Sequence, residues 1–130
     1  MDSDILTIAP NPLTRRLLER LLRQSGYWPT VVSNEFEALD ALERTTFTAM
    51  IIDTESVNFD FEHFLKLVGM ARLGMPHLLV IALTTDSDSF ALQQLSGIRL
   101  EAVLMKPVRP ELLLETLAGT LPSAASTRGR

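Results

Sequence analysis

Three polar residues, Asp53, Thr84 and Lys106, each follow a short apolar run that is predicted to form a β-strand. Ligands of doubly wound sheets gather beyond the carboxyl ends of the strands, so these side chains are expected to share one crevice. A carboxylate there can accept a phosphoryl group covalently, while a hydroxyl and an ammonium hold its oxygens. Each residue alone has an ordinary role as a turn residue, strand residue or solvated charge. Their order at three successive strand ends favours phosphoryl chemistry.

The elements that would position these residues alternate between short β-rich runs and longer segments of helical period. This pattern is typical of a parallel sheet with helices on both faces. The expected strands are 5–8, 30–33 (after a turn containing Tyr27, Trp28 and Pro29), 49–52, 78–83 and 102–105. The expected helices run from Pro12 to before Gly26, from Asn34 with Phe36, Leu39 and Leu42 inward, around 61–68, over 89–96 with Gly97 as cap, and from Pro110 to about Leu121. The fold class is therefore α/β, a doubly wound sheet of five parallel strands flanked by five helices.

Composition limits the class of protein. The chain has 130 residues, of which 46% are hydrophobic, no cysteine and a formal net charge of -4. This length suits one compact domain, and the lack of cysteine excludes disulfides and thiolate sites and fits the cytoplasm. No apolar run approaches the roughly 18 residues of a membrane span, and an acidic balance argues against direct nucleic-acid binding. We expect a cytoplasmic domain over 1–121 with a flexible tail or linker over 122–130.

From about Ile5 to Leu121, the chain resembles the receiver domains of bacterial response regulators and hybrid histidine kinases. The resemblance is carried by the segments NPLTRRLLERLLRQSGY, SNEFEALDAL, MIIDTES, VIALTTD and LMKPVRPELLLETL. It implies the flavodoxin-like receiver fold, with strand order 2-1-3-4-5. It also implies that Asp53 matches the phospho-acceptor, Thr84 the switch hydroxyl, and Lys106 the lysine that pairs with the phosphoryl group. A cis bond is then expected between Lys106 and Pro107.

The chain departs from the receiver pattern at several positions. Receivers usually carry two adjacent acids after the first strand, which bind Mg²⁺ together with the acceptor, and here these positions hold Ala9 and Pro10. Neither side chain can ligate a metal. The aromatic switch position of the fifth strand holds Val103, and the usual Met-Pro beyond the acceptor is absent as well. Glu55 and Asn11 are the residues that would supply substitute oxygens.

The missing acids change the charge of the expected site. Three carboxylates and one lysine would sum to -2 and would require a divalent cation, whereas Asp53 and Lys106 alone sum to zero. We therefore predict an ion pair between Asp53 and Lys106, no cofactor, and no metal or only weak Mg²⁺ binding. Phosphoryl transfer depends on charge neutralisation, so losing the metal should slow it at least about a thousandfold.

These features predict an atypical response-regulator receiver domain in two-component phosphorelay signalling, rather than an enzyme. It would act mainly as a protein-interaction module, with impaired Mg²⁺-dependent phosphorylation at Asp53. Two alternatives stay open. One is an ordinary phospho-accepting receiver with an unusual metal site. The other is a haloacid-dehalogenase-like hydrolase with Asp53 as nucleophile, in which Glu55 would replace the usual second aspartate.

Partners are indicated mainly by the resemblance. It implies a histidine kinase, a phosphotransfer domain or an output domain, and a homodimer face formed by the fourth helix, the fifth strand and the fifth helix. No direct contact with nucleic acid or membrane is expected of this domain. The polar side of the first helix carries four arginines and forms either a solvated face or a docking surface. These are Arg15, Arg16, Arg20 and Arg23.

Overall fold

The computed structural model describes residues 4–55, 61–85 and 97–120. These residues contain one parallel sheet with strand order β2-β1-β3-β4-β5. The strands are β1 (Asp4–Ile8), β2 (Trp28–Val32), β3 (Ala49–Asp53), β4 (Leu79–Thr84) and β5 (Ala102–Met105). The helices are α1 (Pro12–Gln24), α2 (Glu35–Arg44), α3 (Phe61–Gly74) and α5 (Pro110–Thr120). The doubly wound fold and its strand order are confirmed, while the helix expected over 89–96 and the tail over 122–130 lie outside the described residues.

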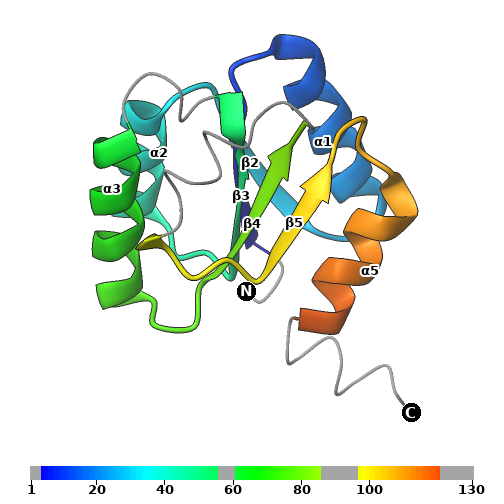
Figure 1. The fold of residues 1–130 in the computed structure, drawn as a ribbon. Coiled ribbons are helices and arrows are strands. Elements are labelled where there is room, and N and C mark those ends of the chain that lie inside the picture. Colours follow the sequence, from blue (N-terminus) through cyan, green and yellow to red (C-terminus); the bar gives the residue numbers. More distant parts are fainter. Residues whose placement is uncertain (1–3, 56–60, 86–96, 121–130) are drawn as a thin grey trace.

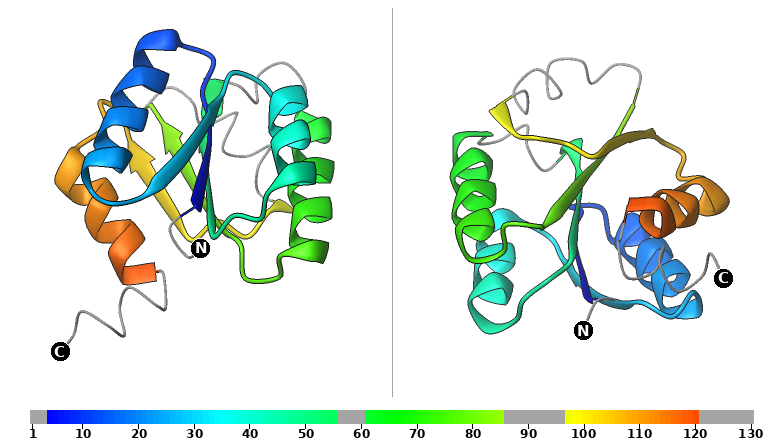
Figure 2. Two further views of the ribbon diagram at one scale, coloured as in Figure 1. Left: turned by 180° about the vertical axis from the view of Figure 1, so that it is seen from behind. Right: turned by 90° about the horizontal axis from the view of Figure 1, so that it is seen from below.

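The sheet separates two layers of helices. Helices α1 and α5 cover one face, and α2 and α3 cover the other (Figures 1 and 2). Successive residues of a strand point to opposite faces, so Ile5 and Ile51 pack in the core beneath α1 and α5, and Leu6 and Met50 pack beneath α2 and α3. Burial on both faces explains why the central strands are continuous apolar runs. None of the helices in the described part of the chain is long and apolar enough to span a membrane.

Strand β2 begins earlier than the sequence predicts. The turn expected at Trp28 and Pro29 is wrong, because both residues belong to β2 and pair with Asp4 and Ile5 of β1. Proline cannot donate to a ladder, but β2 is an edge strand, where a missing N–H is tolerated. The indole of Trp28 is 62% exposed at this edge.

Two asparagines begin the helices next to the sheet's carboxyl edge. Asn11 Oδ1 accepts the N–H of Leu13 at 2.8 Å and caps α1. Asn34 Oδ1 accepts the N–H of Glu37 at 2.9 Å, and Glu37 Oε1 accepts the N–H of Ser33 at 2.8 Å. The predicted capping box is therefore confirmed, with the glutamate reaching back to the residue before the cap. The N–H and hydroxyl of Ser33 lower the pKa of Glu37.

Helix α2 does not bury every apolar residue as predicted. Leu39 and Leu42 pack partly against the core, and Ala38 is fully buried, but the ring of Phe36 is 67% exposed. A helix turns about 100° per residue, so Phe36 lies about 200° from the buried Ala38, on the other side of the helix. The prediction that Phe36 points inward is therefore wrong.

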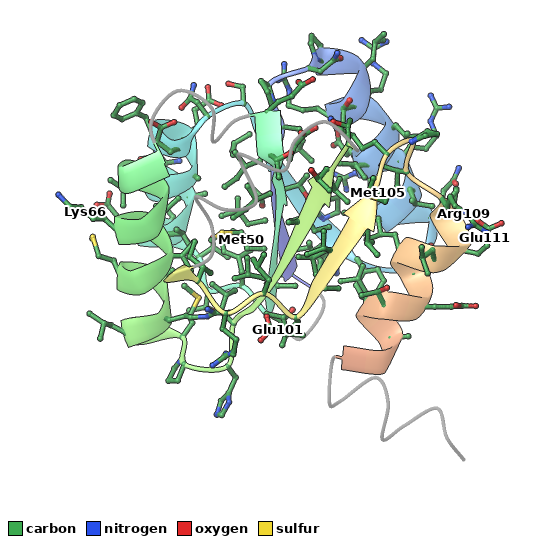
Figure 3. All side chains as sticks on the ribbon, in the orientation of Figure 1. Met50, Lys66, Glu101, Met105, Arg109 and Glu111 are labelled. Atoms are coloured by element: carbon green, nitrogen blue, oxygen red, sulfur yellow. The ribbon has the colours of Figure 1, made fainter. Side chains whose placement is uncertain are left out.

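A small ionic cluster lies at the end of the sheet opposite the strands' carboxyl ends, where Figure 3 shows Glu101. Glu101 Oε1 accepts the N–H of Val80 at 2.6 Å and Arg72 Nη2 at 3.3 Å, and Oε2 accepts Arg99 Nε at 2.8 Å. Arg72 also donates to the carbonyls of Leu78 and Arg99. Burial and the charge of Arg99 lower the pKa of Arg72, and Glu101 opposes this shift. The cluster ties α3 to the start of β4 and β5.

Glu101→Ala is expected to lower the free energy of unfolding by about 2–3 kcal/mol, because the Val80 N–H and the Arg72 guanidinium lose a shared acceptor. Urea denaturation followed by circular dichroism measures the loss. Arg99→Ala is the matched control. Its side chain is 63% exposed, so its removal should change stability by no more than about 0.5 kcal/mol. Equal losses in the two variants would contradict the interpretation.

Candidate functional site

The three predicted residues meet at the carboxyl edge of the sheet. Asp53 ends β3, Thr84 ends β4, and Lys106 follows β5, so the parallel register of three neighbouring strands brings them together. Lys106 Nζ donates to both carboxylate oxygens of Asp53, at 3.0 Å to Oδ1 and 2.9 Å to Oδ2. The carboxylate is fully buried and the lysine side chain is 16% exposed. The predicted ion pair is confirmed, and the bond between Lys106 and Pro107 is cis as expected.

The hydroxyl of Thr84 belongs to a short chain of hydrogen bonds. It donates to the carbonyl of Thr85 at 3.3 Å and accepts from the hydroxyl of Thr54, also at 3.3 Å. Thr54 and Thr84 are both fully buried. Thr54 was not among the predicted site residues, and its only signal in the sequence was its place directly after Asp53 at a strand end. The site therefore holds two hydroxyls in contact with each other.

The structure places the two candidate substitute ligands differently. Glu55 lies at the site. Its N–H donates to Asp53 Oδ1 at 3.0 Å, and its Oε2 is 3.9 Å from Lys106 Nζ, with half of the side chain exposed. Asn11 uses its side-chain oxygen to cap α1. A ligand role for either residue stays a prediction. Val103, at the position of the missing aromatic, pairs with Ala82 and is 45% exposed.

Arg15 binds the backbone of the two residues that stand where receivers usually carry two acids. Its Nη1 donates to the carbonyl of Ala9 at 2.8 Å and to the carbonyl of Pro10 at 2.9 Å. Arg15 was predicted to lie with the other arginines of α1 on a solvated or docking face, but its partly buried guanidinium folds back onto the end of β1. The spacing of six residues from Ala9, one turn into the helix, was the signal available in the sequence. After the hydrogen bonds from Ser33, the charge of Arg15 also lowers the pKa of Glu37.

These contacts decide whether the residues present fit Mg²⁺, which requires hard oxygen ligands in near-octahedral geometry. Both oxygens of the buried Asp53 are bound to an ammonium, and the carbonyls of Ala9 and Pro10 are bound to a guanidinium. Across residues 4–55, 61–85 and 97–120, no three acidic, histidine or cysteine side chains gather in a way that could hold a metal. The donor set does not fit Mg²⁺, and Lys106 already neutralises the carboxylate.

Part of the chain is similar in sequence to known sensory proteins. No protein-family model matches it. Over 115 residues, or 88% of the chain, it is 32% identical to the sensory/regulatory protein RpfC of Xanthomonas campestris pv. campestris strain 8004. Over the same length it is 28% identical to the sensor protein TorS of Escherichia coli strain K12. The matches cover 15% and 12% of those proteins, so the chain spans a small part of the curated relatives.

Solved structures show the same fold. A CheY-like response regulator receiver domain protein from Methanospirillum hungatei JF-1 matches with a TM-score of 0.79 and 21% identity, over 98% of this chain and 99% of that one. The receiver domain of a sensor histidine kinase from Pseudomonas aeruginosa PAO1, which has a magnesium ion in its active-site cleft, gives 0.79 and 22%, over 94% and 99%. The carboxyl edge of the sheet carries the aspartate, threonine and lysine that the resemblance predicts. The chain has the fold of CheY-like receiver domains, and the predicted resemblance to them is confirmed.

Proposed function

We propose that this receiver domain works in two-component phosphorelay signalling as a protein-interaction module, with impaired Mg²⁺-dependent phosphorylation at Asp53. One observation carries the proposal. Lys106 binds both oxygens of Asp53, while Ala9 and Pro10 stand at the positions of the usual acids and offer only carbonyls bound to Arg15. The acceptor carboxylate is present, but it is neutralised by Lys106.

The chemistry of transfer explains why this arrangement impairs phosphorylation. An Asp53 oxygen must form the new P–O bond while the bond between phosphorus and the donor's leaving group breaks. Lys106 holds both of those oxygens, so attack requires the carboxylate to give up part of a buried ion pair. Charge developing on the phosphoryl group would be met by Lys106 and the hydroxyl of Thr84, without the divalent charge that usually offsets most of it.

Intact-mass spectrometry tests the proposal. The chain is incubated with acetyl phosphate and Mg²⁺ beside an ordinary receiver domain, and Asp53→Asn serves as the site control. We expect phosphoryl incorporation at Asp53 at least about a thousandfold slower than in the ordinary receiver. Incorporation at a matching rate that disappears in Asp53→Asn would reject the proposal in favour of an ordinary phospho-accepting receiver with an unusual metal site.

The same proposal assigns partners of the signalling class. A histidine kinase, a phosphotransfer domain or an output domain would bind this cytoplasmic domain, and neither nucleic acid nor membrane would. A homodimer through the fourth helix, β5 and α5 belongs to the proposal. Support for it comes from Val103, Met105 and Leu112, which are 45%, 45% and 38% exposed on the described part of this face.

A further inference from the structure

An apolar groove runs between α2 and α3, on the side of the sheet away from α1 and α5. It consists of two adjoining hollows of about 230 and 170 Å³, which share Leu39, Leu67 and Met70. Phe36 lies at one end and Met75 at the other. Within this groove, the side chains of Phe36 and Met70 are 67% and 58% exposed. Large apolar side chains are thus exposed together along two neighbouring helices.

The shape and charge of this groove indicate the kind of segment that fits it. Two helices packed side by side leave a furrow into which the side chains of a third helix can pack, and methionine adapts to such partners. Helix α2, which forms one wall, carries four carboxylates and one guanidinium. Glu35 and Glu43 stand at the rim of the groove, eight residues or about 12 Å apart along the helix axis. Lys66 of α3 also lines the groove, so the two carboxylates face one ammonium. The groove therefore suits a basic amphipathic helix.

Helix α1 has this character and lies on the opposite face of the sheet (Figure 2). Leu13 and Leu17 are 71% and 47% exposed, and Arg16 and Arg20 share their face of the helix at spacings of three and four residues. Arg16, Arg20 and Arg23 also line a surface hollow of about 360 Å³. This face combines exposed leucines with positive charge, which complements the apolar floor and acidic rim of the groove.

We propose that α1 of one copy of this chain binds in the groove between α2 and α3 of a second copy. The contact joins two different surfaces, which lie on opposite faces of the sheet, so each copy can use both and further copies can add head to tail. This contact differs from a symmetric dimer through β5 and α5, which stops at two copies. It does not require phosphorylation of Asp53, so it can fail while the proposal for that residue holds.

Sedimentation velocity of the full chain over a range of concentrations tests the contact. We expect the average mass to rise past that of a dimer and the association to weaken with added salt. Two charge reversals should each weaken it at least about tenfold. They are the α1 variant Arg16→Glu with Arg20→Glu, and the groove variant Glu35→Lys with Glu43→Lys. An equal mixture of the two variants should associate again, because each reversed surface meets its complement.

Asp40→Lys is the control on the same helix. Asp40 forms an ion pair with Arg44 and lines neither hollow of the groove, so this variant reverses a charge on α2 outside the proposed contact. This control should associate like the wild type. Circular dichroism checks that each variant folds, and Met70→Lys, which puts a like charge opposite Arg16 and Arg20, replaces the groove variant if that one does not. A wild type that stays monomeric, association unaffected by both reversals, or a mixture that stays monomeric would overturn the proposal.

Discussion

Replacing Ala9 and Pro10 with aspartate (A9D/P10D) is expected to raise phosphorylation of Asp53 from acetyl phosphate by about a thousandfold in the presence of Mg²⁺. Ala9 is fully buried at the end of β1, next to the strand that carries Asp53, so a carboxylate there joins the site directly. Two added carboxylates turn a neutral ion pair into an acidic site that a divalent cation relieves. Intact-mass spectrometry measures the rate.

Stability gives A9D/P10D a second readout. Without Mg²⁺ the added carboxylates repel Asp53 and should lower the urea midpoint, and Mg²⁺ should restore it because the cation binds the folded state. The double amide variant A9N/P10N has nearly the same shape and no added charge, so it should gain neither phosphorylation nor a response to Mg²⁺. Equal phosphorylation of the amide variant would contradict the role assigned to the missing acids.

Lys106→Met is expected to lower the free energy of unfolding by about 3 kcal/mol, because it removes the charge partner of a fully buried carboxylate. Asp53→Asn should also destabilise, by about 1–2 kcal/mol, since an ammonium that is 16% exposed can still reach water. The direction of the second change is the diagnostic result. In a site with three carboxylates, neutralising one relieves repulsion and stabilises the fold, whereas here it breaks an ion pair. Urea denaturation measures both variants.

A double-mutant cycle isolates the pair itself. Asp53→Asn with Lys106→Met removes both charges, and the combined loss should be smaller than the sum of the two single losses, because no buried charge is left alone. Lys66→Met is the control for loss of a lysine charge. Lys66 is exposed on α3 and points away from the molecule (Figure 3). The free energy of unfolding of Lys66→Met should therefore differ from that of the wild type by less than about 0.5 kcal/mol. An Asp53→Asn variant more stable than the wild type would contradict the neutral ion pair.

Most of the sheet could be predicted because burial on both faces leaves a strong pattern in the chain. The apolar runs of β1, β3 and β4, of which only β1 is interrupted, by the buried Thr7, identify central strands. The polar residues that end β3 and β4 mark the carboxyl edge. Edge strand β2 was placed less well, since it tolerates Pro29, which a central strand would exclude. Phe36 was misplaced because three-residue spacing alone does not distinguish the buried side of a short helix from its exposed side.

The site, like the sheet, could be predicted from the sequence only in part. The sequence by itself determined which chemical groups are present: one acceptor carboxylate, one lysine, one switch hydroxyl, and no acids at positions 9 and 10. From these charges alone the pairing of Asp53 with Lys106 could be predicted. Only the tertiary structure decided what replaces the missing acids. The guanidinium of Arg15 binds the carbonyls of Ala9 and Pro10, and the hydroxyl of Thr54 donates to Thr84 on the neighbouring strand, because the directions of these side chains are set only when the chain folds.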